Sequence, residues 1–570
     1  MIGVIPKATE TAVVKEFFQL FKTPWEFFRA DRSYDVVIAT ADEIPEVDAG
    51  LLLIFGSGIK SSDAQAKITA RSKLRDVNLS YQGTQVPIYG EALTFQATGP
   101  AVLVVTAGSG IAGLKIHSAD RLILRLGYDL FREVEFLLSV GQPIEHARIP
   151  TLEIHIMMLR KWILDAGITF LEIPSTPAGH SFIVCLTHDI DFVGIRQHKF
   201  DHTMWGFLYR STVGAFRDVV RQRISIRRLL KTWQAAASLP FVYLGWMKDF
   251  WVPFDWYLQQ EKNIPSTYFL IPFKKRAGDR VGVRHAKRRA TAYDITDLPE
   301  WTRTLMREGC EIGVHGIDAW HSVDKGREEL GRVAAATGAS EIGIRMHWLL
   351  RDENTFRVLD EAGYSYDSTA GYNETLGYRC GTTQVFRPLG ARRLLELPLQ
   401  IQDGALFYHQ RLDLSEPEAW DLCAALIENA RKLGGVLTIL WHDRSPGPER
   451  FWGDFYAKLV HELRLADVWF GSAGQVVNWF RKRREVVFER LGSRDGTTQV
   501  RLRNGGGKIV PPLRVRVHHP KTRGQGNQAT FWEAGRNTEV PWTGETDIEI
   551  GQCLATDTGF PPKSISSLTE

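Results

Sequence analysis

The sequence predicts an α/β protein built around a barrel of parallel strands. Between residues 181 and 483, apolar runs of strand length alternate with longer helical patterns, and seven or eight such units fit a (β/α) barrel enlarged by insertions. Several of these runs end directly in His, Asp or Arg, as the carboxyl ends of barrel strands often do. A length of 570 residues predicts roughly two to four domains in all.

Residues 1–145 predict a small N-terminal α/β accessory domain. Short strand-like runs occur at 35–39, 51–55, 86–89 and 101–106, and a helical pattern first appears at 127–140. Residues 108–113 formally match a dinucleotide-binding fingerprint. No clear helix follows that stretch, so we predict a tight glycine-rich turn and no nucleotide cofactor.

Residues 146–180 predict a linker with one helix, at 151–166, followed by a boundary rich in Pro and Gly. The barrel, residues 181–483, then contains eight strand candidates. Seven lie at 182–187, 267–271, 311–314, 341–345, 365–367, 394–399 and 436–441, and 468–471 is an additional candidate.

The largest insertion into the barrel, residues 193–250, holds ten Lys and Arg against three Asp and Glu. Apolar residues from Phe216 to Trp233 recur at roughly helical spacing, which predicts an amphipathic helix. We expect a solvated basic face packed on the barrel, with peripheral contact to a polyanion or to membrane headgroups as the alternative.

Residues 484–570 predict a small C-terminal β-rich domain. The segment 513–517 alternates strictly between apolar and basic residues, and a glycine-rich turn precedes it.

Composition excludes several classes of function. The net charge of +4 is small for this length, which argues against a general attraction to nucleic acid. The five cysteines form no CxxC pair, which argues against a disulfide framework or a cysteine-built zinc site. We find no secretory signal and no run of about 18 apolar residues, so we expect a cytoplasmic protein without a transmembrane segment.

Four strand ends in the barrel region carry unusual polar residues, at 187–191, 311–321, 343–348 and 437–443. In a parallel barrel these ends converge on one rim, so residues distant in sequence meet. One Asp and two His make a divalent-metal site with open positions. A second Asp, an Arg and a further His supply a base, its partner and an acid. Together these groups would hydrolyse an ester or an amide.

Each of these residues also has a purely structural alternative. Asp189 and Asp191 could cap a helix, His315 could be a hydrogen-bonded core histidine, and Arg345 could belong to a structural ion pair. Their joint occurrence at successive strand ends favours a site.

The order of these motifs resembles that of the NodB-homology polysaccharide deacetylases, carbohydrate esterase family four, over residues 181–475. Thr187-His188-Asp189-Ile190-Asp191 resembles the first motif, and 311–315 resembles the strand that leads into the second. Arg345 resembles the arginine of the third motif, and Leu440-Trp441-His442-Asp443 resembles the last. Loops at 363–368 and 377–382 resemble those of a divergent branch with an Asp-x-Asp first motif.

The resemblance implies a distorted (β/α)7-type barrel and a divalent metal, most often zinc. It implies that Asp189 is the base, that Arg345 orients it, and that His442 is the general acid. Asp191, His315 and His321 are the implied metal ligands. The candidate substrate-binding residues are His347, Trp348, Asp367 and Arg379.

The first motif departs from the family pattern because Ile190 separates the two aspartates, which are usually adjacent. Residues two apart on a strand point to the same side, so Asp189 and Asp191 can both face the rim.

The second and third motifs also depart from the pattern. His315 and His321 are six residues apart, about 240° around a helix, so they meet only if 316–320 is a loop. Asp318 and His347 are therefore rival metal ligands. The third motif carries Met346 where a proline is usual.

We therefore expect a metal-dependent hydrolase that removes acetyl groups from an N-acetylated, or alternatively O-acetylated, sugar or polysaccharide. Two alternatives stay open. One is a non-catalytic glycan- or surface-binding protein on a deacetylase-like barrel. The other is a hydrolase of another non-peptide carbon–nitrogen bond.

Overall fold

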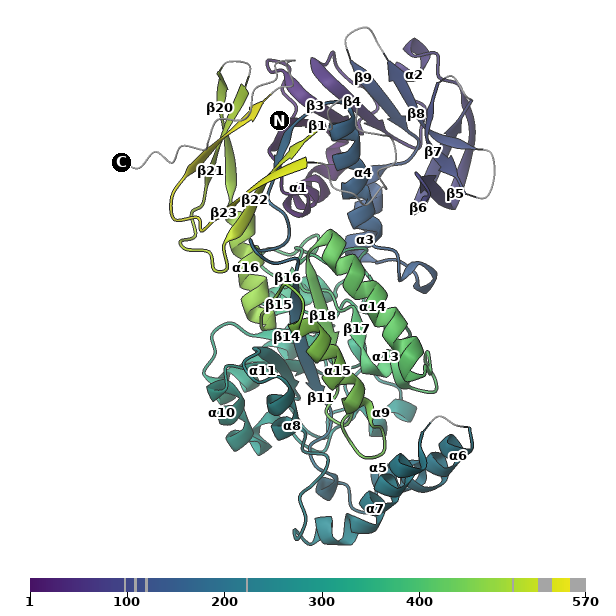
Figure 1. Cartoon of the computed structure of the whole chain (residues 1–570), viewed down its shortest axis with the longest axis vertical. Helices are drawn as coiled ribbons and strands as arrows, with labels where there is room; N and C mark the ends of the chain where they lie inside the picture. Colours follow the sequence, from purple (N-terminus) through teal and green to yellow (C-terminus); the bar gives the residue numbers. More distant parts are fainter. Residues whose placement is uncertain are drawn as a thin grey trace.

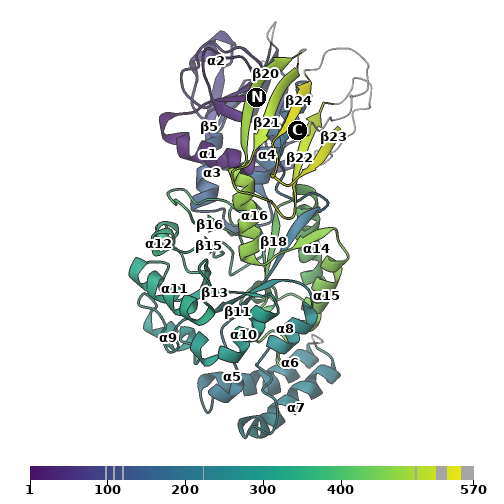
Figure 2. The ribbon, with the colours of Figure 1, turned by 90° about the vertical axis from the view of Figure 1, so that its left-hand side faces the viewer.

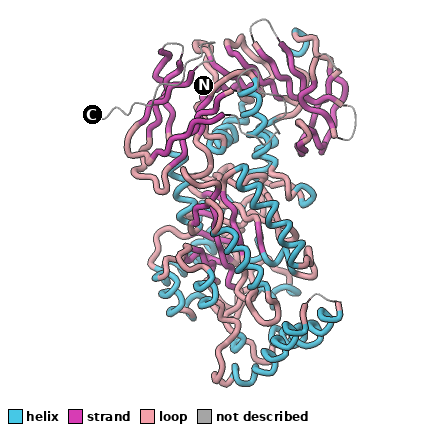
Figure 3. The backbone as a smooth tube through the Cα atoms, viewed as in Figure 1, coloured by secondary structure: helices cyan, strands magenta, loops and turns pink. Residues whose placement is uncertain are grey.

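The computed structural model describes residues 1–96, 99–106, 110–117, 121–221, 224–494, 497–520 and 536–553. Three parts follow one another along its longest axis (Figure 1). The N-terminal sheet and the C-terminal strands share one end, a parallel sheet with flanking helices forms the middle, and a helical appendage forms the other end. Figure 3 shows how strands predominate at the first end and helices at the last.

The N-terminal part is a nine-stranded mixed sheet with the order β2-β1-β3-β4-β9-β8-β6-β5-β7. Strands from β2 to β9 in this order pair in parallel, and those from β9 to β7 pair antiparallel. The strands are β1 Ile2–Ile5, β2 Trp25–Phe27, β3 Tyr34–Ala39, β4 Ala49–Phe55, β5 Ala70–Tyr81, β6 Thr84–Phe95, β7 Ala101–Val105, β8 Ile111–His117 and β9 Leu122–Leu126.

The four predicted N-terminal strands lie within β3, β4, β6 and β7 or overlap them. Helices α1 (Thr11–Leu20), α3 (Leu130–Ser139) and α4 (Thr151–Asp165) pack their apolar faces on this sheet. α1 was not expected from the sequence. β8 begins at Ile111, so a strand stands where the dinucleotide fingerprint would need a helix. Residues 107–109 of that motif region lie outside the described residues.

The middle part is a parallel sheet with the order β16-β15-β14-β13-β12-β11-β18-β17, and β19 pairs with β11. All eight predicted strands appear, and β17 is additional. The strands are β11 Phe182–Ile190, β12 Ser266–Leu270, β13 Glu311–Gly316, β14 Gly343–Met346, β15 Tyr366–Asp367, β16 Leu395–Glu396, β17 Ile401–Gln402, β18 Val436–Leu440 and β19 Val468–Phe470.

This parallel sheet is curled. Adjacent strands lie about 4.8 Å apart, so β14 and β11, three places apart, would be about 14 Å apart in a flat sheet. Arg345 on β14 nevertheless reaches Thr187 and Asp189 on β11 at 2.7 and 3.0 Å. In the described pairing order, β16 and β17 are the two ends of the sheet. The fold is thus a mixed α/β structure around an open, curled parallel sheet.

Helices cover the outside of the curled sheet and pack their apolar side chains against its strands (Figure 2). They are α8 Phe254–Gln260, α10 Pro299–Arg307, α11 Val323–Thr337, α12 Thr355–Ala362, α13 Asp403–Phe407, α14 Glu416–Leu433 and α15 Trp452–Arg464. Two further helices of this part are α9 Val283–Arg289 and α16 Ala473–Glu485. Continuous apolar strands such as β11 and β18 are completely buried, as strands covered on both faces must be.

The C-terminal strands form two three-stranded antiparallel sheets, β20-β21-β24 and β10-β22-β23. They are β10 Phe170–Glu172, β20 Val487–Arg494, β21 Thr497–Arg503, β22 Leu513–His519, β23 Arg536–Trp542 and β24 Ile548–Cys553. One apolar core joins them to α16 and to the inner face of the curled sheet, below the cavity side chains of the same face. Residues 521–535 and 554–570 of the predicted β-rich region lie outside the described residues.

A buried arginine ties these parts together. The guanidinium of Arg483 donates hydrogen bonds to the backbone carbonyls of Gln19, Leu20, Ile173 and Pro174. Across the described residues, no helix is both long and apolar enough to cross a lipid bilayer.

Candidate functional site

Strand β11 sends alternate side chains to opposite sides of the sheet at its carboxyl end. Asp189 and Asp191, the latter just past the strand, line a cavity of about 700 Å³. His188 and Ile190 point the other way, where Ile190 joins the apolar core and His188 contacts Glu261 at 2.8 Å. The two-residue period of a strand thus places both carboxylates on one side.

The cavity lies over the carboxyl ends of several strands. It is lined by Asp189 on β11 and Asp191 just after it, by His315 on β13, by His347 after β14 and by His442 after β18. Five strands, β11, β13, β14, β17 and β18, therefore contribute to one space, as a curled sheet allows. Aromatic groups and amides complete the lining: Phe192, Trp348, Tyr408, Asn373, Gln402 and Gln410.

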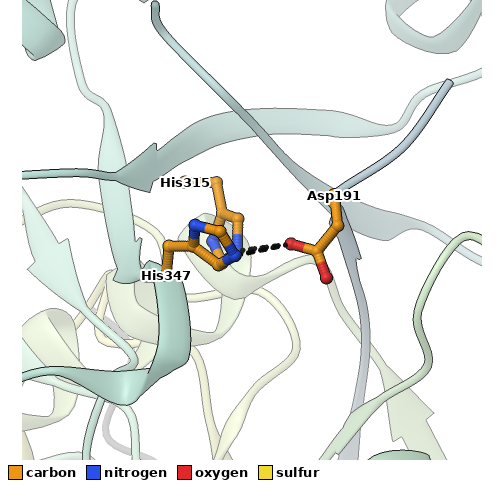
Figure 4. A group of neighbouring side chains, drawn as sticks. All are labelled: Asp191, His315 and His347. Carbon is orange, nitrogen blue, oxygen red and sulfur yellow. Dashed lines mark ion pairs between the residues drawn. The ribbon is translucent and has the colours of Figure 1, made fainter. Parts of the chain in front are cut away.

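Asp191, His315 and His347 form a group that can hold a metal ion (Figure 4). One ligand atom from each lies within 4.8 Å of the others. The Oδ1 atom of Asp191 lies 3.3 Å from Nε2 of His315 and 3.2 Å from Nε2 of His347. This buried oxygen makes no well-formed hydrogen bond. An orphaned carboxylate oxygen facing two imidazole nitrogens matches the donor set of a divalent-metal site.

Protonation of these groups also suits a metal. The Nδ1 atom of His315 lies 3.0 Å from the carbonyl oxygen of Arg345 and donates its hydrogen there, which leaves the Nε2 lone pair free. Burial lowers the pKa of His347 to about 4 although Asp191 opposes the shift, so this imidazole is neutral at pH 7. Burial alone would raise the pKa of Asp191, but His347 and His315 hold it well below its usual range.

Arg345 fixes the second carboxylate. Its Nη1 donates to Oδ1 of Asp189 at 3.0 Å and to the Thr187 hydroxyl at 2.7 Å. Nε and Nη2 donate to the backbone and hydroxyl oxygens of Ser368, and the guanidinium stacks over the Phe269 ring. Arg345 is completely buried. A charged hydrogen-bond donor held in this way fixes the orientation of the Asp189 carboxylate.

His442 stands at the cavity with a buried carboxylate behind it. Its Nδ1 lies 2.5 Å from Oδ1 of Asp403, and its backbone N–H donates to Oδ2 at 2.8 Å. Burial alone would lower the pKa of His442, but Asp403, and more weakly Asp191 and Asp189, raise it to about 10. This imidazole is therefore protonated at neutral pH and can give a proton to a ligand in the cavity.

Asp443 braces the end of β11. Its Oδ1 accepts a hydrogen bond from the backbone N–H of Asp191 at 3.1 Å. Burial, together with the charge of Asp191, raises the pKa of Asp443 to about 7.

The structure does not bring His321 to the metal-binding group. β13 ends at Gly316, and the chain turns away so that Nε2 of His321 lies 3.2 Å from Oδ1 of Asp318. The backbone N–H groups of Ile317 and Asp318 donate to the buried Glu329, which holds this turn in place. The expected place of His321 is taken by His347, one of the two rival ligands.

The candidate substrate-binding residues separate into two pairs. His347 and Trp348 line the cavity, and Trp348 adopts a left-handed backbone conformation with φ of 68°. Asp367 is buried beside Thr369 instead, and Arg379 donates to the carbonyl oxygens of Gln142 and Val140 near α3. Asp367 and Arg379 therefore support neighbouring loops.

Sequence reasoning missed two residues that position the site. Asp403 follows strand β17, which has only two residues and is too short to be predicted from an apolar run. Arg289 is buried and donates to the carbonyl oxygens of Ile317 and His347, which joins the ends of β13 and β14. Only the charge of these residues marked them in the sequence, and charge alone does not locate a site.

Comparison with known proteins gives structural likenesses of low similarity. No family model matches the sequence, and no curated protein matches it by sequence. A polysaccharide deacetylase from Mycobacterium smegmatis, described as putative, is similar over 57% of this chain and 99% of its own, with 21% identity and a TM-score of 0.33. Agd3, a carbohydrate deacetylase, is similar over 96% of this chain and 99% of its own, with 11% identity and a TM-score of 0.35. PuuE allantoinase covers 54% of this chain and 92% of its own at 15% identity and a TM-score of 0.32. Because these scores are low, the functional conclusion rests on the site itself.

Proposed function

We propose that this protein is a metal-dependent hydrolase that removes acetyl groups from an N-acetylated sugar or polysaccharide. One observation carries the proposal. A single cavity brings together a metal-binding group, a carboxylate fixed by a buried arginine, and a protonated imidazole backed by a buried carboxylate. These are the parts that hydrolysis of an amide requires.

Asp191, His315 and His347 would hold the cation, and Zn²⁺ suits their one-oxygen, two-nitrogen donor set. A divalent cation there would act as a Lewis acid on the acyl oxygen and make a water molecule more acidic. His315 is kept in the right tautomer by the carbonyl oxygen of Arg345.

Asp189 would act as the base. Its carboxylate faces the cavity and is oriented by Arg345, so it can accept a proton from a water molecule as that water attacks the acetyl carbon. His442 would act as the acid and give its Nε2 proton to the departing nitrogen. The Asp403 carboxylate stabilises the imidazolium before the transfer and fixes the ring through Nδ1.

The lining of the cavity supports a sugar as the substrate. Aromatic rings from Phe192, Trp348 and Tyr408 stand beside the amides of Asn373 and Gln402. Apolar faces with a few placed donors and acceptors suit a polyhydroxylated ligand. The resemblance of residues 187–191, Arg345 and 440–443 to the motifs of polysaccharide deacetylases points to the same substrate class.

The test is acetate release from N-acetylglucosamine oligomers by the full chain. Activity should disappear after chelation and return with Zn²⁺. Asp189→Asn and His442→Ala should each lower kcat by at least about a hundredfold, which is the usual contribution of a positioned base or acid. Asp421→Asn, an exposed change on α14, is the matched control and should keep full activity.

Two outcomes would overturn the proposal. Full activity in Asp189→Asn would remove the base from the mechanism. Hydrolysis of a cyclic amide without any acetate release from acetamido sugars would assign the site to another carbon–nitrogen bond.

A further inference from the structure

The helical appendage, residues 195–250, forms the end of the molecule farthest from the N-terminal sheet (Figure 1). α5 (His202–Tyr209), the π-helical segment η4 (Arg210–Gly214) and α6 (Ala215–Val220) run on as one helix. α7 (Ile226–Tyr243) packs against η4 and α6. The small core of the appendage consists of Ile195, Phe207, Leu239, Val242 and Trp251.

α7 buries one apolar face and exposes another. Its buried face includes Leu229, Leu239 and Val242. The exposed apolar residues of α7 and its C-cap are Ile226, Leu230, Trp233, Phe241 and Leu244, with exposed fractions between 43% and 66%. At about 100° per residue they fall within a stripe about 80° wide. The apolar residues from which the sequence predicted an amphipathic helix include Ile226, Leu230 and Trp233, and the structure leaves these side chains exposed.

The continuous helix of α5, η4 and α6 carries a similar stripe. Trp205, Tyr209, Val213, Phe216 and Val220 recur every three or four residues, and each is between 55% and 67% exposed. Residues at this spacing share one face of a helix. Phe200 and Trp246, just outside the helices, are exposed by 81% and 73%. Exposed apolar side chains in this number on one small part of a protein are typical of a binding surface.

Basic side chains border both stripes. Arg217, Arg221, Arg227 and Lys231 each directly follow a stripe residue, and all four are exposed. Each therefore lies about 100° around the helix from an apolar neighbour. Residues 193–250 carry ten Lys and Arg against three Asp and Glu. The exposed face of the appendage thus combines large apolar groups with positive charge.

We propose that the appendage docks on an anionic lipid surface. The two stripes enter the headgroup region, and the neighbouring Arg and Lys side chains contact lipid phosphates. Trp and Tyr suit this position because their rings are apolar and their polar ends reach water. A second copy of the chain fits less well, since an isologous contact would bring the same basic residues face to face.

Docking would also orient the cavity. His202, Thr203 and Arg210 belong to the appendage and line the cavity, so one wall of the site is built by the docking element itself. The mouth of the cavity is thereby held close to the lipid surface. The lipid contact goes beyond the proposed function and does not depend on it.

The test is co-sedimentation of the full chain with lipid vesicles. The protein should bind vesicles of phosphatidylcholine mixed with phosphatidylglycerol and bind vesicles of phosphatidylcholine alone at least about tenfold less. A stripe variant with Trp205→Ser, Leu230→Ser and Trp233→Ser should lose at least about tenfold in binding. Its matched control changes three apolar residues outside the appendage that are even more exposed, Ile59→Ser, Leu465→Ser and Val510→Ser, and should bind like the wild type.

A charge variant keeps the test decisive if the stripe variant misfolds. Arg217→Glu, Arg227→Glu and Lys231→Glu alter exposed side chains only, and they should abolish binding to anionic vesicles. Failure of the wild type to bind anionic vesicles at low salt would overturn the proposal. So would a wild-type dimer in light scattering that the stripe substitutions convert to a monomer, because the stripes would then contact a second copy.

Discussion

Replacing Asp403 by Asn removes the charge behind His442 while keeping a side chain of the same size. Both carboxylate oxygens of Asp403 contact His442, one through the imidazole Nδ1 and one through the backbone N–H. Burial opposes protonation of His442, but the carboxylates raise its pKa from 6.5 to about 10. That rise corresponds to about 5 kcal/mol. Asp403 is the largest contributor, so Asp403→Asn should lower the pKa by at least about two pH units, or about 3 kcal/mol.

The assay is a pH titration of the His442 ring by NMR in metal-depleted protein. In the wild type His442 should keep its proton through neutral pH and lose it as the pH rises through about 10. In Asp403→Asn the proton should leave within the neutral range, and the alkaline limb of kcat/KM should move to lower pH with it. Identical titration of His442 in the two proteins would refute the reasoning. Asp421→Asn, exposed on α14, should leave the titration unchanged.

The same pair affects stability with a definite sign. The folded-state pKa of His442 lies above the unfolded value, so its contribution is complete below about pH 6.5 and is lost as the pH rises through about 10. The advantage of the wild type over Asp403→Asn in the free energy of unfolding should therefore shrink over that range. Denaturant unfolding at several pH values measures it.

The remaining predictions concern the metal-binding group and Arg345. His347→Ala should retain no zinc after dialysis while His321→Ala retains it, as measured by elemental analysis; equal zinc in both variants would contradict the placement of His347. Zinc at about 100 times its Kd should raise the free energy of unfolding of the wild type by about 2.7 kcal/mol and leave that of His347→Ala unchanged. Arg345→Met leaves the buried carboxylate of Asp189 without its partner, so denaturant unfolding should show a loss of about 3–5 kcal/mol; a loss near zero would mean that the pair does not hold Asp189.

Much of the middle sheet could be predicted because its strands are buried on both faces. The continuous apolar runs of β11 and β18 mark them without any need for alternation. β17 has only two residues, Ile401 and Gln402, and its place is set by pairing with β18. No run of that length stands out in a sequence. α1 was missed because its Val and Phe side chains are also those of a strand.

The candidate site was partly predictable for a related reason. Asp189 and Asp191 stand at the end of a strand so apolar that its end is obvious in the sequence. Arg345 and His442 likewise stand at the ends of apolar strands. The choice between His321 and His347 depends on which loop turns into the cavity, and sequence distance carries no such information. His347 comes from the neighbouring strand end, while His321 is drawn aside by Asp318.

The cavity is built by two separate parts of the chain, because the appendage supplies one of its walls. The groups proposed for chemistry sit on the rim of the curled sheet, whereas His202, Thr203 and Arg210 sit on a helix that contributes nothing to that rim. Substitutions in the helix can therefore reshape one wall of the cavity while the side chains of the rim stay unchanged. Selection can act on the shape of this wall and on the groups of the rim as nearly independent traits, and an engineer can exchange one while keeping the other.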